Sequence, residues 1–193
     1  MQLIIYAHPD KNSFNHAILE TTKTAFEKQE KDYKLIDLYE INYNPVLSYD
    51  ELNGKNSEQT IGFQKIIKEA KNIIFIFPVW WFRAPAILEG FCDKTFTIGF
   101  SYRFKKIIGI YGIPVRLLKD KNVTAFITHG APALPVKILY LNAVKYRFLL
   151  GFLSFNFKLM RCSIYQFWAV PFVSKEKRQK YLRRVEKIIS RMN

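Results

Sequence analysis

Three unbroken apolar runs constrain what this chain can fold into. They are LIIYA (3–7), NIIFIF (72–77) and VTAFIT (123–128), each of strand length and rich in β-branched or aromatic residues. A strand exposed on one face alternates apolar and polar residues, whereas a strand covered on both faces is apolar throughout. The runs therefore predict a parallel sheet that is buried on both sides.

Weaker patterns complete this architecture. YKLIDLY (33–39) and RCSIYQFW (161–168) bring the number of expected strands to five. Helical patterns lie between the strands, over about 13–29, 57–71, 85–96, 135–150 and 174–192. Because strands and helices alternate, we expect one α/β domain over residues 1–193, with helices on both faces of a mostly parallel sheet. Residues 99–122 are predicted to be a long connection with its own turns, and loops of that length are usually functional.

The cellular setting is predicted from small signals. Cys92 and Cys162 have neither metal-ligand spacing nor the number expected of a disulfide scaffold. The N-terminus lacks the basic start of a signal peptide, and the apolar stretch 138–157 is interrupted by Lys145 and Arg147. We therefore expect a soluble cytoplasmic protein without a bound metal.

The charge is uneven along the chain. Thirty Lys and Arg outnumber sixteen Asp and Glu, giving +14, and residues 101–193 carry +16 while residues 1–100 carry −2. Such an excess favours anionic partners: phosphorylated cofactors, nucleic acid or an acidic membrane surface. A solvated basic face is the alternative explanation, because net charge governs solubility and steering rather than fold.

Ligands of an open α/β sheet bind beyond the carboxyl ends of the strands. The segments that follow the three strong strands are HPDKNSFNH (8–16), PVWWFRAP (78–85) and THGAP (128–132). The first opens a helix, where free amides and the helix dipole favour a phosphate. An N-cap and an Asx turn are its plain structural explanation. The chain contains neither a G-x-G-x-x-G nor a Walker A sequence.

Each of the other two segments also has a ligand-binding explanation and a purely structural one. Trp80, Trp81 and Phe82 are consecutive rings, so they cannot all point into one core, and at least one is expected to line a cavity or an interface for a planar ligand. Gly130 lets the backbone approach a ligand, and Thr128 or His129 offers a hydrogen bond. A simple turn is the alternative for this last segment.

Motifs in these segments resemble one family. YAHPDKNSFNHAI (6–18), FPVWWFRAPAILEGFCDKTF (77–96) and the pair GFSYRF and GIPVRLLKDKNV before the fourth strand are similar to sequences of the flavodoxin-like NAD(P)H quinone oxidoreductases. That group contains mammalian NAD(P)H quinone dehydrogenases, bacterial modulator-of-drug-activity proteins and ancillary subunits of potassium efflux systems. The resemblance covers about residues 1–135, and its second motif is the most specific.

The resemblance implies a three-layer sandwich with a five-stranded parallel sheet of order 2-1-3-4-5, and a flavin, FMN or FAD, at the strand ends. It assigns the flavin phosphate or pyrophosphate to His8, Ser13, Phe14 and Asn15. It places the isoalloxazine along Pro78, Val79, Trp80, Trp81 and Phe82, with the opposite edge closed by Thr128, His129 and Gly130. The family often has two glycines after the Thr, so THGAP departs from its pattern at this edge.

The implied activity is ping-pong hydride transfer from NAD(P)H to flavin N5, followed by two-electron reduction of a quinone or similar acceptor. His129 and Tyr140 are the candidate catalytic residues. Arg83 either reaches the 2′-phosphate of NADPH or lies in solvent. The family implies a homodimer with the site at the interface, and the apolar, basic segment 138–161 is either a dimer contact or an opening for the acceptor.

Two other functions compete with this one. The first is a flavin-binding regulatory or ancillary subunit with little turnover. The second is a basic protein that binds nucleic acid or a membrane surface. No sequence motif for nucleic-acid binding supports the latter strongly, so we expect no nucleic-acid partner and at most weak association with an anionic membrane.

Overall fold

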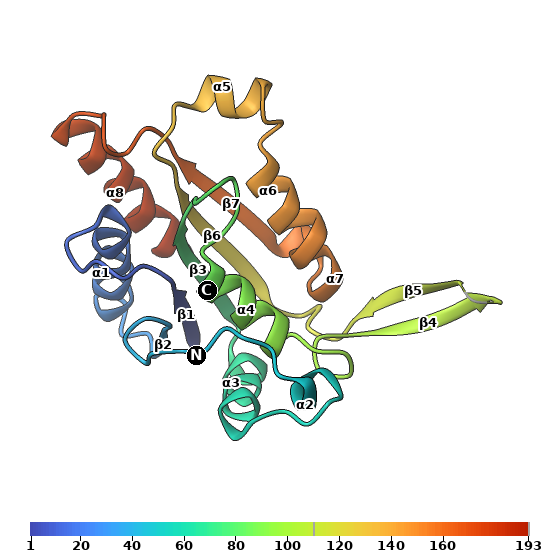
Figure 1. The fold of residues 1–193 in the computed structure, drawn as a ribbon. Helices are drawn as coiled ribbons and strands as arrows, with labels where there is room; N and C mark the ends of the chain where they lie inside the picture. Colours follow the sequence, from blue (N-terminus) through green and yellow to red (C-terminus); the bar gives the residue numbers. More distant parts are fainter. Residues whose placement is uncertain (110, 193) are drawn as a thin grey trace.

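The computed structural model describes residues 1–109 and 111–192. Its large sheet consists of β1 (Gln2–Tyr6), β2 (Tyr33–Asp37), β3 (Asn72–Pro78), β6 (Asn122–Thr128) and β7 (Cys162–Phe167). All neighbours pair in parallel, in the order β2-β1-β3-β6-β7 (Figure 1). Because β6 and β7 are the fourth and fifth strands of this sheet, the predicted order 2-1-3-4-5 is confirmed.

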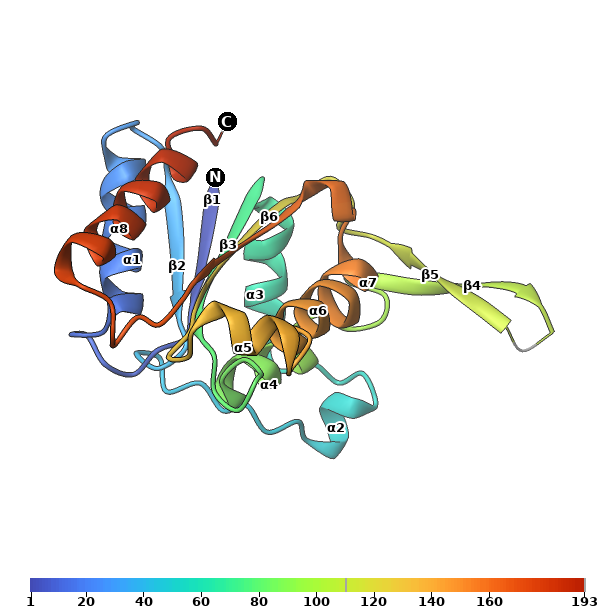
Figure 2. The same cartoon turned by 90° about the horizontal axis from the view of Figure 1, so that it is seen from above.

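Helices cover both faces of the sheet. On one face lie α1 (Phe14–Glu27) and α8 (Lys175–Ile189), and on the other lie α3 (Glu58–Glu69), α4 (Ala86–Thr95) and a segment of short helices (Figures 1 and 2). The remaining short helices are α2 (Tyr49–Leu52), α5 (Ala133–Ile138), α6 (Ala143–Tyr146), a π-helix (Arg147–Leu153), α7 (Ser154–Asn156) and a 3-10 helix (Leu159–Arg161). Within residues 1–109 and 111–192, no helix has the length and apolar content needed to cross a membrane.

The central strands β1, β3 and β6 are mostly apolar because successive side chains point to opposite layers, and both layers are buried. In β1, Ile4 and Tyr6 pack with α1 and α8, whereas Leu3 and Ile5 pack with α3 and α4. The same alternation in β3 sends Phe75 and its second neighbours to the α3 and α4 side. Both layers therefore select apolar residues along the central strands, although Gln2, Asn72 and Thr124 are buried there as well.

The apolar segment 138–161 divides between core and surface. Four of its side chains are buried in the layer under α4, namely Val144, Phe148, Leu153 and Phe157. The Phe148 ring lies 5.3 Å from Phe75 and 5.1 Å from Phe77, measured between centroids. Much of the segment is therefore needed to cover the sheet, while Leu139, Leu150 and Met160 are among its exposed residues.

The single helix predicted over about 135–150 is wrong. Leu141 and Asn142 have φ of 48° and 50°, in the left-handed region, so the chain ends α5 and restarts as α6 and the π-helix. Neither residue is a glycine or a proline, and Asn142, which adopts left-handed backbone more readily than most non-glycine residues, is a weak signal of the break.

Within residues 99–122, which were predicted to be a long connection with its own turns, the structure has a β-hairpin with a register shift between Lys106 and Ile108. The strands β4 (Tyr102–Ile108) and β5 (Tyr111–Arg116) pair antiparallel and project away from the sheet (Figures 1 and 2). At its base, Tyr102 lies 6.1 Å from the Phe155 ring. The exposed apolar residues of this β4–β5 arm are Phe104, Ile107, Ile108, Tyr111 and Ile113.

Replacing Phe148 with alanine should lower the free energy of unfolding by about 3 kcal/mol, because it empties space against two rings of β3. Urea denaturation followed by far-UV circular dichroism measures this loss. Phe172→Ala is the matched control, since Phe172 is 81% exposed, and it should change the free energy by less than about 0.5 kcal/mol. Equal effects of the two substitutions would contradict a core role for Phe148.

Candidate functional site

The three loops expected to form a site meet at the carboxyl edge of β1, β3 and β6. Asn15 and Thr128 join the first loop to the third, with Asn15 Nδ2 donating to Thr128 Oγ1 at 2.9 Å and Oγ1 lying 3.1 Å from Asn15 Oδ1. The Val79 amide donates to the Thr128 carbonyl at 2.8 Å. His8 and Trp80, from the first and second loops, have ring centroids 6.2 Å apart. Thr128 is therefore the shared anchor of the crevice.

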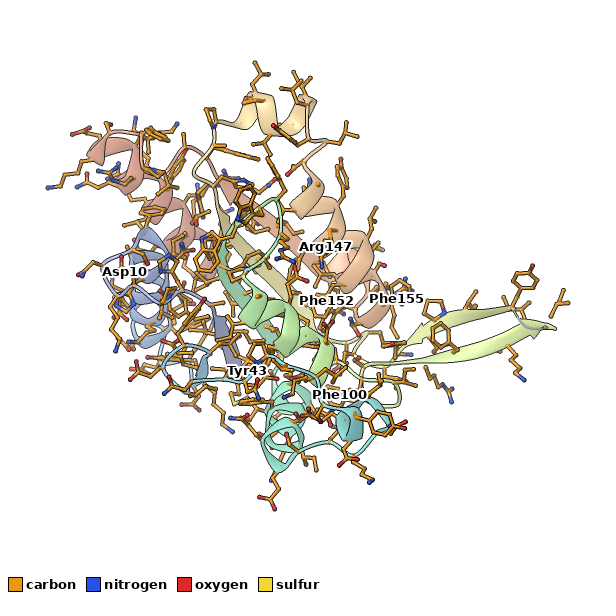
Figure 3. All side chains as sticks on the ribbon, in the orientation of Figure 1. Asp10, Tyr43, Phe100, Arg147, Phe152 and Phe155 are labelled. Carbon is orange, nitrogen blue, oxygen red and sulfur yellow. The ribbon has the colours of Figure 1, made fainter. Side chains whose placement is uncertain are left out.

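The first loop ends in the amino terminus of α1. Ser13 Oγ accepts from the His16 amide at 3.1 Å, and Asp10 Oδ1 accepts from the Asn12 amide at 2.7 Å; Asp10 is labelled in Figure 3. The N-cap and Asx turn are thus present. Within residues 1–109 and 111–192, the amides of Phe14 and Asn15 have no protein acceptor. These amides, at the positive end of a 14-residue helix, can hold an anion.

Two buried polar atoms near this helix start also lack partners among the described residues. They are Tyr6 Oη and His16 Nδ1, whose rings lie 6.2 Å apart. Burial raises the pKa of Tyr6 to about 12, against a smaller opposing effect of Ser13, so its hydroxyl stays a neutral donor. Buried polar groups normally have a hydrogen-bond partner, so Tyr6 Oη and His16 Nδ1 can bond to a ligand at this end of α1.

The second loop turns tightly on bulky residues. Trp80 and Arg83 exchange backbone hydrogen bonds of 3.0 and 3.1 Å, and between them Trp81 and Phe82 have φ of 51° and 57°. Left-handed backbone destabilises a non-glycine residue by about 1 kcal/mol or more. Trp81 is 90% exposed and Trp80 40%, and Phe82 is half-buried. None of the three rings is therefore core.

Phe82 connects this loop to the segment after α5. Its ring stacks on Tyr140, with centroids 4.2 Å apart and planes inclined by 23°. Arg83 points elsewhere: with Glu89 and Arg147 it lines a cavity of about 220 Å³ beside α4. Arg147 is visible there, on the π-helical segment (Figure 3), and donates to Glu89 at 2.8 Å.

The third loop is held by its own backbone. The His129 amide donates to the Phe167 carbonyl at 2.8 Å, and the His129 ring is 2% exposed. Burial lowers the pKa of His129 to about 4, so the imidazole is neutral at physiological pH. Gly130 has an ordinary φ, and a Cβ added there would meet no atom within 4 Å. The glycine therefore leaves open space beside the strand end.

Sequence reasoning missed two features of this crevice. Tyr6 and His16 lie on β1 and α1, where each has the look of a core residue, and only the tertiary structure shows their unmet polar atoms. The resemblance implied that backbone amides of residues 78–82 lie near the polar edge of the ring, but that the free amides are those of Trp81 and Phe82 was missed, because it depends on the left-handed turn. The available signal was Tyr6, a polar-tipped residue that follows three aliphatic residues at the end of β1.

A parallel sheet of this order, with a crevice at its carboxyl edge, defines a flavodoxin-like α/β protein. The chain belongs to the family described as having a flavodoxin-like fold, whose model matches residues 2–189.

Curated relatives match part of the chain. It is 36% identical over 134 residues to an uncharacterized NAD(P)H oxidoreductase of Haemophilus influenzae, covering 67% of this chain and 64% of that protein. It is 32% identical over 123 residues to NAD(P)H dehydrogenase [quinone] 1 of Cavia porcellus, covering 53% and 45%. The match thus spans less than two thirds of either relative.

Solved structures match along the whole chain. Smu.1420 of Streptococcus mutans has a TM-score of 0.86 at 27% identity, with both chains fully covered. An FMN-dependent NADH-azoreductase of Bacillus anthracis, solved with FMN, has a TM-score of 0.80 at 17% identity, covering 98% of each chain. The second likeness concerns the fold alone.

Thr128→Val should lower the free energy of unfolding by about 1 to 3 kcal/mol, because it leaves the buried Asn15 amide without its partner. Urea denaturation measures the change. Thr24→Val is the matched control, since Thr24 is exposed on α1, and it should change the free energy by less than about 0.5 kcal/mol. An unchanged stability of Thr128→Val would mean that the Asn15–Thr128 pair does not hold the loops together.

Proposed function

We propose that this chain is a flavin-dependent NAD(P)H:quinone oxidoreductase. The observation that carries the proposal is the turn from Trp80 to Arg83, which holds two bulky residues in left-handed backbone and exposes an indole at the strand ends. Strained backbone of this kind concentrates at ligand clamps, and a flat apolar surface suits a planar ring. The quinone dehydrogenase and the FMN complex among the similar proteins support the same assignment.

Each loop has a part in the proposed site. The amides of Phe14 and Asn15, shaped by the Ser13 cap and His8, would hold the flavin phosphate. The stretch Pro78–Val79–Trp80–Trp81–Phe82 would lie along the isoalloxazine, and Thr128, His129 and Gly130 would border its opposite edge. The unpaired polar atoms of Tyr6 and His16 fit a ligand with many oxygen atoms.

A bound flavin would supply two-electron chemistry: it would accept hydride from NAD(P)H at N5 and reduce a quinone-like acceptor in a ping-pong sequence, with solvent supplying the proton of the hydroquinone. The chain's own residues position the reactants and stabilise charge. Within the described part of the chain, the amides of Trp81 and Phe82 have no protein acceptor. They can therefore donate to negative charge on a reduced ring without reorganising.

The two candidate catalytic side chains, His129 and Tyr140, have surroundings that suit different roles. His129 is buried and neutral, with a pKa of about 4, which suits a positioning role better than proton donation near pH 7. Tyr140 is 49% exposed and stacks on Phe82, so it lies where an acceptor would approach. We propose Tyr140 as the residue that meets the acceptor.

The flavin proposal predicts that the purified protein retains FMN or FAD, loses flavin absorbance with NADPH or NADH under anaerobic conditions, and regains it with a quinone. Mass analysis of the extracted flavin distinguishes FMN from FAD. A protein that binds flavin but does not turn over would favour the ancillary-subunit alternative. A protein that takes up neither flavin would contradict both, and salt-sensitive retention on nucleic acid would then favour the anion-binding alternative.

A crevice-filling variant sharpens this experiment. Gly130→Leu projects a side chain into open space at the strand ends, so it should weaken flavin binding at least tenfold while leaving the fold intact. Gly62→Leu is the matched control, because a Cβ at Gly62 on α3 also meets no atom within 4 Å. If Gly130→Leu binds flavin like the control, Gly130 does not border the flavin.

We also propose a homodimer in which the partner completes each site. The exposed apolar residues of the β4–β5 arm support this proposal, as do Leu134 and Ile138 on α5, which are 69% and 61% exposed. An anionic membrane surface is the alternative partner of the arm, since Arg103, Lys105 and Lys106 form no ion pair within the described residues.

Light scattering after size exclusion should give a dimer, and the double substitution Ile108→Lys with Tyr111→Lys should give a monomer, because it places charge on the apolar arm. Leu52→Lys, at a residue 69% exposed on α2, should leave the dimer intact. A wild-type monomer that floats with phosphatidylserine vesicles would contradict the dimer and favour the membrane.

A further inference from the structure

A second left-handed turn faces the one that carries the tryptophans. Leu141 and Asn142 have φ of 48° and 50°, and the Ala143 amide donates to the Tyr140 carbonyl at 2.9 Å. The two turns touch through the stacked rings of Phe82 and Tyr140. Each turn holds two consecutive non-glycine residues in left-handed backbone, and together these four conformations destabilise the fold by several kcal/mol. Neighbouring contacts must therefore hold both turns in place.

Gln166, on β7, holds the second turn. Its Nε2 donates to Asn142 Oδ1 at 2.8 Å, and Asn142 Nδ2 donates back to Gln166 Oε1 at 2.9 Å. Asn142 is 7% exposed, and its backbone N–H donates to the Val136 carbonyl at 2.9 Å. The side-chain pair is therefore a reciprocal, shielded contact at a strained residue.

The same Gln166 amide also reaches the third loop of the crevice. Its Nε2 lies 2.9 Å from His129 Nε2. An amide nitrogen that donates one proton to Asn142 and the other to His129 makes His129 Nε2 the acceptor, and we infer from this arrangement that the ring proton is on Nδ1. The other side of this contact is closed by Trp168, whose ring stacks on His129 with centroids 3.9 Å apart.

Lys137, on α5, makes a cation–π contact with Trp168. Its Nζ lies over the indole, 5.7 Å from the centroid of Trp168. Burial keeps the pKa of His129 at about 4, and an uncharged imidazole is the form that this amide and indole can accommodate. The network therefore links β6, β7 and the segment after α5 without a buried charge.

We propose that Gln166 is a positioning residue of the site: it holds His129 as the neutral Nδ1–H form and ties the Thr128–Gly130 edge to the turn that places Tyr140 on Phe82. Its effect on cofactor and acceptor binding rests on the proposed flavin site. Gln166 itself touches none of Trp81, Phe82 or Tyr140 by hydrogen bond within the described residues, so its action is through Asn142 and His129.

Nuclear magnetic resonance of the flavin-free protein tests the network directly. We expect ¹⁵N shifts of the Nδ1–H tautomer for His129 at pH 7, and contacts between the Tyr140 and Phe82 rings in nuclear Overhauser spectra. Gln166→Leu should remove the ring contacts. Gln166→Glu keeps the size but has no N–H for His129, so it should move the His129 proton to Nε2. Wild-type Nε2–H, or ring contacts that persist in Gln166→Leu, would overturn the proposal.

Flavin binding tests the functional part. Gln166→Leu should raise the FMN dissociation constant about tenfold, because two buried polar groups lose a partner and the Tyr140 turn loosens. The matched control is Gln64→Leu, since Gln64 Nε2 donates to Thr95 O and Thr97 Oγ1 at 3.0 and 3.1 Å, far from the crevice in the fold. Equal FMN affinity in the two variants would overturn the positioning role. A wild type that binds no flavin would instead contradict the proposed function, and the resonance experiment would still decide on the network.

Discussion

Burial of the central strands on both faces is the constraint on which the rest of this structure depends. β1, β3 and β6 have apolar side chains in both layers, so helices must cover both sides of the sheet. Parallel pairing then sends every strand end to the same edge. Polar residues that cannot enter either layer collect there, and this is why loops from residues 8, 79 and 129 onward form one crevice.

Within that crevice, two turns with strained backbone are held by hydrogen bonds from neighbouring strands. The turns at Trp81–Phe82 and Leu141–Asn142 place non-glycine residues in left-handed backbone, and the rings of Phe82 and Tyr140 stack between the two turns. The supporting contacts come from strand residues that do not move easily: Thr128 at the end of β6 and Gln166 on β7. A rigid sheet thus holds an unfavourable loop geometry, which leaves amides and an indole exposed to a ligand.

The sequence predicted those parts of the fold that depend on local pattern. Continuous apolar runs identified β1, β3 and β6, and serine caps identified the starts of α1 and α8. The β4–β5 arm was missed because its residues pair with each other and not with a core, which leaves no periodicity to read. The helix expected over about 135–150 was wrong because Leu141 and Asn142 break it for reasons of tertiary packing.

The sequence by itself therefore determined the family, through its motifs, and which loops would meet, through its hydrophobic runs. The order of strands was implied by the resemblance to that family. Only the tertiary structure decided what each site residue does. Asn15 is committed to Thr128, His129 is buried against Trp168, and Trp81 is exposed. The first two outcomes depend on partners more than thirty residues away along the chain, and no local pattern encodes the distance between atoms that meet only after the sheet has formed.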